Sequence, residues 1–530
     1  MWVVLGLVGI LTLLMYYLTR PPKNFWGKYG VRQVNDYVID KIKLLLGRKT
    51  IMDLDDIIYK RLESSQEQFC GVVELQGNMV LIKDLDLLKK VFIKDFEYFV
   101  DRRLVVSSDS QPIFHKFLLN LRGDEWKAVR SSVSPTFTTG KIRRMMESFN
   151  KVSREWVHHL KTKIENSSDD SSTVIKAGEE ARHFTVDVIS STVFGMEAKA
   201  ISNPDSLFAI MTDRLSSLSP LQIAKFLMMM FLPRVVNFFR IKVMDDKAIT
   251  FFENILMQGM KSRMNGETKK NDFLQLIAEV RKGELKAQDE ELSAIEKDAK
   301  LAEDVADGKL QKKNILKDGM MAIAQLLQFF FAGFSTTSNF ITFALYALAL
   351  NPDVQDKLRE ELDSKLFKDG KDSEMDYDEL NGLVYLDMFV CEVFRVIPPN
   401  GRLERLCVKE YHDPETGLRV PKGAYVYTPL QAIHNDPKYY EHPDKFYPEH
   451  FTPEKKAERN PYTYLPFGIG PRNCIGMRFA LVKSKAAIAQ IVHNFFIEPT
   501  SKTPRSIQIK TIGIAIQPPD NLELRLRLRS

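Results

Sequence analysis

The chain has 530 residues, 44% of them apolar, and a net charge of +6 that is spread over many acids and bases. A chain of this size can bury a core that needs neither disulfides nor structural zinc. The dispersed charge argues against a nucleic-acid partner. The four cysteines lack the short paired spacing of zinc sites, and so few of them fit a reducing compartment. One of them is then available for chemistry.

The N-terminal run from Trp2 to Leu18 has no charged residue and predicts a membrane anchor. As a helix it would be roughly 27 Å long, enough to cross the bilayer core. Pro21 and Pro22 end that helix, and the basic residues after it place the remainder in the cytosol. A cleaved signal peptide and a buried core helix are the alternatives. We therefore predict an anchor over residues 1–19, a basic linker over 20–32 and one large domain over 33–530.

Past the anchor the predicted elements are mixed, and helix dominates. Apolar runs that flank Gly77 and Asn78 predict a hairpin, and Asp84 is placed to cap the following helix. The pattern from about 141 to 280 is helical with breaks near three prolines, and 281–313 is a charged, solvated connection. Residues 320–350 are apolar on every face, which predicts a buried central helix. The alternation over 522–529 predicts a strand.

A glycine-rich loop carries Cys474 in the stretch Phe-Gly-Ile-Gly-Pro-Arg-Asn-Cys-Ile-Gly, from Phe467 to Gly476. A thiolate that binds iron is well held on such a loop, because glycines permit positive φ angles and a close approach to a macrocycle. Backbone amides can then point at the sulfur and tune it. Arg472, two residues before the sulfur, can pair with a carboxylate of the macrocycle. The alternative is a glycine-rich turn with a buried structural cysteine.

This stretch matches the haem-binding signature of the cytochrome P450 family, and the chain resembles that family from about Lys28 to Leu526. It is most similar to animal microsomal members, especially the insect branch that handles foreign compounds. The resemblance implies a mainly α fold, a triangular helical prism with a smaller β-rich lobe, behind an N-terminal transmembrane anchor. It implies haem, iron-protoporphyrin IX, with Cys474 as the metal ligand. The activity implied for residues 33–530 is a haem-thiolate monooxygenase that inserts one oxygen atom from O2 into lipophilic xenobiotics or endogenous lipids and hormones.

Several further residues would hold the haem by the same resemblance. Haem brings two carboxylates into an apolar pocket, so several arginines are needed to balance them. Trp126 and Arg130, spaced i,i+4, match a pair that grips the propionates, although an amphipathic helix with a buried tryptophan would look alike. The remaining matches are Phe467, Gly468, Arg472, Arg405 and Arg102.

Glu392 and Arg395 stand at i,i+3, where they can form an ion pair on one helix face. Alone, such a pair is commonly a surface salt bridge. In the family it is structural and locks its helix to the loop before the cysteine. The family usually has arginine where this chain has His450, so the lock is weaker or depends on a protonated histidine.

The segment from Ala332 to Thr337 resembles the oxygen-binding element of the family. Thr336 matches the proton-relay threonine, and the second expected catalytic position is Ser335, where the family usually has an acid. Cleavage of dioxygen requires two protons, which a carboxylate can relay, whereas a serine can only position water. We therefore expect appreciable release of peroxide in place of product. The alternative is that Ser335 only bonds a helix carbonyl.

Residues of the substrate pocket can be placed only by resemblance. Phenylalanine and methionine make adaptable apolar surfaces, which suit lipophilic ligands. The apolar segment 226–232 fits such a pocket and a membrane interface equally well. The pocket positions are Phe114, Phe117, Ala332, Gly333, Phe334, Ile397 and Ile514.

The resemblance also implies partners and a location. NADPH–cytochrome P450 reductase would deliver electrons from NADPH, docking on the cysteine side near Lys127 and Lys483, and cytochrome b5 is a second partner to consider. The chain would be bound to the endoplasmic reticulum membrane, with its catalytic domain facing the cytosol. Two other functions stay open because of Ser335. One is a haem-thiolate isomerase or dehydratase that rearranges peroxides without a reductase, and the other is a non-catalytic haem ligand sensor.

Overall fold

The computed structural model describes most of the chain after residue 23. The predicted anchor, part of the linker, most of segments 226–232 and 281–313, and Ile514 lie outside the described residues. The described residues are 24–34, 40, 43–44, 48–74, 77–103, 111–167, 171–216, 221–222, 225, 228, 233–242, 244–285, 315–368, 374–506, 509–512, 515–519 and 521–529.

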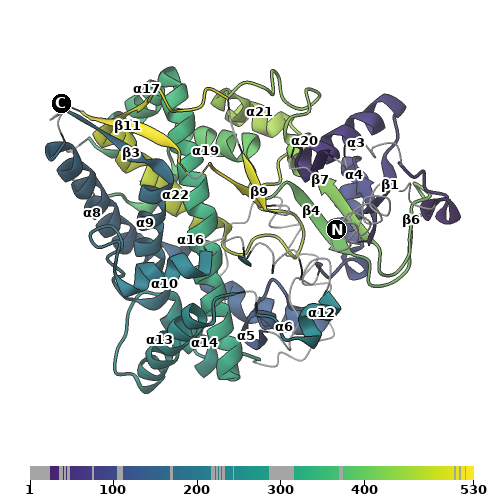
Figure 1. Cartoon of the computed structure of the whole chain (residues 1–530), viewed down its shortest axis with the longest axis horizontal. Helices are drawn as coiled ribbons and strands as arrows, with labels where there is room; N and C mark the ends of the chain where they lie inside the picture. The colour runs from purple at the N-terminus through teal and green to yellow at the C-terminus, as the bar shows by residue number, and fades with distance from the viewer. Residues whose placement is uncertain are drawn as a thin grey trace, which may run out of the picture.

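A long helix, α16 (Gly319–Leu350), runs through the middle of the molecule (Figure 1). Asp318 caps it by accepting a hydrogen bond from the Met320 amide at 2.9 Å. Its side chains are buried on nearly all faces, as its uniformly apolar sequence predicts. Among the described helices, α16 is the one long and apolar enough to span a membrane, but its burial identifies it as the core helix.

Other helices surround α16 and form the larger, helical part (Figure 1). Of the breaks predicted in the 141–280 region, Pro204 lies between helices and Pro233 begins one, whereas Pro220 lies outside the described residues. Proline suits a first helical position because its missing N–H is not needed there. The other α-helices are α3 (Ile51–Ser65), α4 (Leu85–Lys89), α5 (Pro112–His115), α6 (Gly123–Val133), α7 (Thr139–Arg143), α8 (Met146–Glu165), α9 (Ala177–Ile189), α10 (Leu207–Ser216), α12 (Pro233–Phe238), α13 (Asp246–Asn265), α14 (Phe273–Lys282), α17 (Pro352–Glu361), α18 (Tyr377–Asn381), α19 (Val384–Val396), α20 (Leu430–His434), α21 (Pro453–Glu458) and α22 (Met477–Asn494).

Short 3-10 and π turns join or extend these helices. Three of them are π turns that directly continue α4, α9 and α17. They are η1 (Trp26–Tyr29), η2 (Lys90–Lys94), η3 (Phe96–Tyr98), η4 (Ser134–Phe137), η5 (Ser190–Phe194), η6 (Ile315–Lys317), η7 (Leu362–Leu366), η8 (Pro448–Phe451) and η9 (Pro461–Thr463).

A smaller lobe, at the right in Figure 1, contains a four-stranded sheet in the order β1-β2-β7-β4. Its strands are β1 (Phe69–Glu74), β2 (Gly77–Ile82), β4 (Arg402–Leu406) and β7 (Tyr425–Pro429). β2 pairs with β7 in parallel, and the other neighbours are antiparallel. The predicted hairpin is confirmed, but Gly77 and Asn78 belong to β2, so the chain reverses before them.

A three-stranded antiparallel sheet in the order β3-β11-β8 packs beside the helices. It confirms the strand predicted over 522–529, which is β11 (Glu523–Leu528) and lies between β3 (Ser172–Lys176) and β8 (Phe495–Pro499). Two small ribbons complete the described strands, β5 (Tyr411–His412) with β6 (Arg419–Val420) and β9 (Lys510–Ile512) with β10 (Ala515–Gln517). The fold is thus mainly α with a smaller β lobe, as predicted.

Candidate functional site: a cysteine loop and an arginine cluster

The loop from Phe467 to Gly476 is held by its own backbone. The Cys474 amide donates to the Phe467 carbonyl at 2.8 Å, and the Asn473 amide donates to the Gly470 carbonyl at 2.9 Å. Gly468 and Gly470 have φ angles of 74° and 73°, a region that side chains other than glycine rarely adopt. The two positive φ angles turn the chain tightly enough to place Cys474 just before α22.

Gly470→Ala should prevent this loop from closing. A Cβ at Gly470 would lie 2.1 Å from the Phe92 carbonyl oxygen, and the left-handed backbone alone costs about 1–2 kcal/mol. We expect most of the protein to lack haem, measured as the ratio of haem absorbance to protein. Gly417→Ala is the matched control, because its φ is 73° and nothing lies within 4 Å of its Cβ. Equal haem content in both variants would contradict the prediction.

Cys474 is the accessible cysteine among those in the described part of the chain. Its side chain is exposed, whereas those of Cys70, Cys391 and Cys407 are buried. Surrounding protein nevertheless raises the pKa of the Cys474 thiol, while the Gly476 amide and nearby arginines oppose that rise. The amide therefore points at the sulfur, as predicted for a sulfur that must carry negative charge. A metal ion would deprotonate the thiol outright.

Four predicted arginines gather around the cysteine loop. Arg102 donates to the Arg472 carbonyl at 2.6 Å, and Arg130 grips Asn473 through its carbonyl at 3.1 Å and its side-chain oxygen at 2.7 Å. Arg405 donates to the Ile469 carbonyl at 3.4 Å. Arg472 itself donates to the Leu121 carbonyl at 2.7 Å. Segments far apart in sequence thus bring their guanidinium groups to one place.

This cluster is short of negative charge. Burial and neighbouring arginines lower the pKa of Arg405 far below its usual value and that of Arg472 to about 8. The opposing carboxylates are Asp101, 3.5 Å from Arg472, and Glu404, which also pairs with another arginine. Arginine stays charged in proteins. The cluster therefore requires further anions.

A haem with two propionates fits this requirement. The buried Nε atoms of Arg102, Arg405 and Arg472 have no hydrogen-bond partner among the described residues. Charge-assisted bonds from guanidinium to carboxylate would satisfy such donors and restore the charge balance. With Cys474 at the same site, the donor set suits an iron porphyrin bound through sulfur.

Trp126 supports the cluster through its ring. The side chain is buried on α6, and the Arg472 guanidinium lies 4.2 Å from the ring centroid. This cation–π contact orients Arg472. Trp126 is therefore buried, as the alternative of an amphipathic helix expects, and it also contacts Arg472, a predicted site residue.

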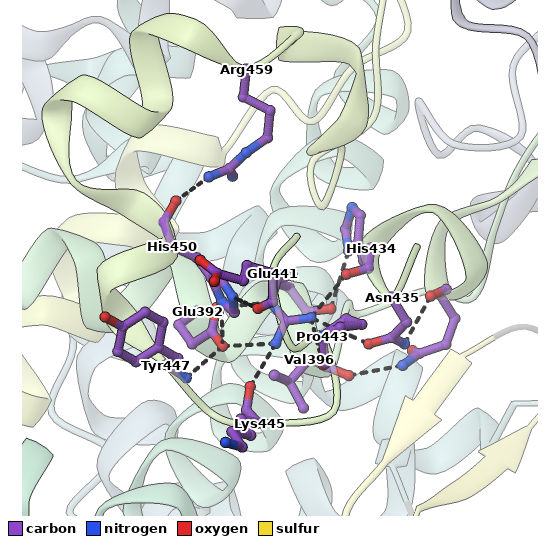
Figure 2. Close-up of polar contacts among 12 residues, drawn as sticks. Glu392, Val396, His434, Asn435, Glu441, Pro443, Lys445, Tyr447, His450 and Arg459 are labelled. Carbon is purple, nitrogen blue, oxygen red and sulfur yellow. Dashed lines mark hydrogen bonds and ion pairs between the residues drawn. The ribbon is translucent and has the colours of Figure 1, made fainter. Parts of the chain in front are cut away.

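Glu392 and Arg395 form a fully buried pair on α19, with both side chains 0% exposed. Arg395 donates Nε–H to one carboxylate oxygen at 2.8 Å and a terminal N–H to the other at 2.7 Å. Burial would raise the pKa of Glu392, but the bonds from Arg395 and His450 leave it below its usual value. Arg395 also donates to the carbonyls of His434, Pro443 and Lys445. The pair thus ties α19 to the end of α20, where His434 lies, and to the loop that carries Pro443 and Lys445 (Figure 2).

His450 completes this network in place of the usual arginine (Figure 2). Its Nδ1 lies 3.2 Å from both Glu392 carboxylate oxygens, and its Nε2 contacts the Glu441 carbonyl. The His450 ring thus links Glu392 to the Glu441 carbonyl. Arg459 adds a bond to the His450 carbonyl.

The segment around Thr336 is an accessible part of α16. Ala332 and Thr336 are exposed one turn apart in the middle of this mostly buried helix. The Thr336 hydroxyl donates to the Ala332 carbonyl at 2.7 Å, which leaves its oxygen free to accept. Phe340, one turn further on, stacks on Phe394 at 4.2 Å, and Phe394 contacts Phe467 of the cysteine loop. This aromatic chain joins the Thr336 face to the loop.

Ser335 is half-buried beside Thr336. Its hydroxyl has no hydrogen-bond partner among the described residues, in contrast to Thr336, which bonds a helix carbonyl. The alternative in which Ser335 only bonds a helix carbonyl is therefore not supported.

Two of the predicted pocket residues on α16 pack against neighbouring side chains. A Cβ at Gly333 would lie 2.6 Å from the Ile189 side chain, so the glycine allows close packing of α16 on α9. Phe334 is 1% exposed and packs on Phe330 at 5.3 Å. The assignment of Phe334 to the pocket is corrected, because the helix turns this side chain into the core. Gly333 is half-buried, and its assignment stays a prediction.

The other pocket predictions fall in different places. Phe114 on α5 packs against Phe117 at 4.6 Å, and Phe114 remains partly accessible. Ile397 lines a small apolar cavity between α16 and α19, together with Phe343 and Val393. Ile514 lies outside the described residues.

The prediction that Lys483 contacts a reductase is wrong. Lys483 is buried on α22 and donates to the Gly333 carbonyl at 2.6 Å. Lys127 is half-buried near Asp124 and stays at the surface of α6. Sequence reasoning also missed Asn473, the partner of Arg130, although its place next to Cys474 could have suggested a role.

Comparison with known proteins agrees with this geometry. Residues 47–525 match the family described as Cytochrome P450. Cytochrome P450 9e2 of Blattella germanica is 32% identical over 97% of this chain and 95% of its own length. Probable cytochrome P450 9f2 of Drosophila melanogaster is 29% identical over all of both chains, and Cytochrome P450 3A7 of Homo sapiens is 33% identical over 84% of this chain and 82% of its own. The chain belongs to the cytochrome P450 family and is a haem-dependent monooxygenase of the insect-like animal type.

Proposed function

We propose that this monooxygenase inserts one oxygen atom from O2 into lipophilic small molecules, with electrons that NADPH–cytochrome P450 reductase delivers from NADPH. The observation that carries the proposal is the meeting of Cys474 with an arginine cluster that lacks counter-charge. Haem, when bound through the sulfur, supplies the oxygen chemistry. The resemblance of the sequence to the insect branch that handles foreign compounds favours xenobiotics, with endogenous lipids or hormones as the other substrates.

The side chains divide the work between binding and proton handling. Cys474 is the sulfur ligand, and Phe467 and Gly468 shape its loop. Thr336 holds a proton on its hydroxyl and accepts from water, and Ser335 orders that water. The apolar side chains Phe114 and Phe117 exclude bulk water and favour lipophilic ligands. The propionates are held by Arg102, Arg130, Arg405 and Arg472, which Trp126 supports.

The proposed placement of the chain is at the endoplasmic reticulum membrane. Residues 1–19 would span the bilayer, 20–32 would link, and 33–530 would form the catalytic domain in the cytosol. This placement rests on the uncharged N-terminal run and the basic residues after it. It also puts the domain where the reductase, and cytochrome b5 as a further donor, would meet it.

The test is a carbon monoxide difference spectrum on the full-length protein, with reductase and NADPH as the only source of electrons. A strongly red-shifted Soret band would support both sulfur ligation and electron entry from the reductase. A band that forms only with a chemical reductant would overturn the proposed electron donor. Turnover should also fall steeply as salt rises, because docking of a reductase is electrostatic.

Ser335→Glu should improve coupling. A carboxylate at this half-buried position can relay protons, whereas the serine hydroxyl can only order water. We expect the peroxide released per NADPH oxidised to fall by about threefold or more, a modest part of the 10²–10⁴-fold that positioned proton transfer can contribute. Thr336→Ala is the comparison variant and should raise the same ratio. An unchanged ratio in Ser335→Glu would show that the missing acid does not limit proton delivery.

A further inference from the structure

A lysine in the interior reaches the backbone beside Thr336. Lys483 lies on α22, is 0% exposed and donates from Nζ to the Gly333 carbonyl at 2.6 Å. Its Nζ also lies 5.2 Å from the centroid of the Phe479 ring. A cationic group at this depth is unfavourable unless something compensates for the lost water. The bond to the Gly333 carbonyl of α16 is one such compensation.

No acid explains the position of Lys483. Burial lowers the pKa of Lys483 to about 7, and no charged group among the described residues offsets that effect. Lys485, two residues later on the same helix, instead pairs with Asp387 at 2.9 Å. The two buried lysines thus differ in kind, because Lys485 balances an acid and Lys483 binds only a helix carbonyl and a ring face.

The carbonyl that Lys483 binds belongs to the turn that carries Thr336. Two successive carbonyls there accept side-chain donors, Ala332 from the Thr336 hydroxyl and Gly333 from Lys483. Side-chain donors that bind helix carbonyls compete with the backbone N–H groups and bend the helix locally. Lys483 therefore binds α16 between the accessible positions Ala332 and Thr336, where such a bond can bend the helix.

The helix that carries Lys483 begins at Met477, directly after the cysteine loop. We propose that Lys483 is a positioning residue of the monooxygenase reaction, which holds the Gly333 carbonyl and so sets Thr336 relative to Cys474. The inference rests on the proposed function, because that function gives Thr336 its role in proton delivery. Lys483 acts through the backbone of α16 and does not touch the substrate.

The test compares Lys483→Met with Lys483→Gln in the full-length protein with reductase. The two new side chains are equal in length, and only glutamine can donate a hydrogen bond. For Lys483→Met we expect a shifted carbon monoxide stretching frequency in the reduced protein. We also expect the peroxide released per NADPH to rise by about threefold to tenfold, the effect of losing one hydrogen bond. Lys483→Gln should return both quantities most of the way to wild type.

Lys485→Met is the matched control, since it removes a buried lysine from the same helix without touching α16. Its carbon monoxide stretching frequency and its peroxide released per NADPH should equal those of wild type. The proposal is overturned if Lys483→Met matches wild type, if glutamine gives no recovery, or if Lys485→Met causes the same changes. Absence of the red-shifted band from the wild type would instead overturn the proposed function, so the two failures are distinguishable.

A second readout needs no turnover. An unfolded lysine titrates near about 10.4, whereas burial lowers the pKa of Lys483 to about 7. Between these values the unfolded chain binds more protons, so this lysine makes the folded state more stable as pH rises. Lys483→Met should therefore have a higher Tm than wild type at pH about 7, and this difference in Tm should shrink as the pH rises to about 9. A constant advantage would contradict the burial of the amine and overturn the proposal.

Discussion

Cys474→Ser should abolish the red-shifted Soret band in the carbon monoxide difference spectrum. A serine hydroxyl is not ionised at neutral pH, and oxygen is a poorer electron donor to iron than a thiolate. Among the cysteines in the described part of the chain, Cys474 is the one whose sulfur is exposed and can bind a cofactor, because the other three are buried. Loss of the sulfur should lower turnover by more than about 100-fold, the upper range for removing a supporting group around a metal.

Cys391→Ser is the control for this substitution. Cys391 is buried on α19 beside Asp387, and burial raises the pKa of its thiol to about 11. Its replacement should leave the band in place at slightly lower thermal stability. A normal band in Cys474→Ser, or a lost band in Cys391→Ser, would contradict the assignment of the ligand.

Glu392→Ala and Arg395→Ala should each prevent stable haem incorporation. Both side chains are fully buried, and removal of one partner leaves the other charge without compensation. Breaking such a pair costs about 3–5 kcal/mol, a large share of the 5–15 kcal/mol that stabilises a typical domain. Arg395→Ala also leaves the carbonyls of His434, Pro443 and Lys445 without this donor. The measurement is haem content per protein after purification, with thermal unfolding of whatever folds.

An exposed pair gives the matched control. Lys151 and Glu197 also form an ion pair, but their side chains are 50% and 57% exposed. Glu197→Ala should cost about 0–1 kcal/mol and keep full haem content. Replacement of His450 should have an intermediate effect, because Glu392 would keep Arg395. Normal haem content in both alanine variants of the buried pair would refute the structural role of the network.

Much of the fold follows from local sequence patterns. The central helix was predictable because its residues are apolar on every side, and β11 because apolar and charged residues alternate. The hairpin was predictable but its turn was not, since Gly77 suggested a reversal that the pairing places earlier. Pairing of β2 with β7 depends on contacts between distant segments, which no local pattern records.

The candidate site shows the same division. The cysteine loop and the Glu392–Arg395 pair could be predicted because their residues are close in sequence. The carbonyls that Arg395 binds could not, since they lie 39 to 50 residues away. Lys483 was mistaken for a surface residue because its partner is a backbone carbonyl, and the sequence does not distinguish a lysine that binds backbone from one that faces solvent.

The four-stranded sheet has a consequence for the order of folding. The buried pair of Arg402 with Asp55 joins residues 347 positions apart, and the parallel β2–β7 pairing spans a similar stretch. Closing so long a loop is slow and costs entropy before any contact forms. Because the β1–β2 hairpin is local, we expect it to form first and to leave the β2 edge unpaired until β7 arrives. During that interval it is open to pairing with other chains, a hazard that a chaperone covering strand edges would relieve.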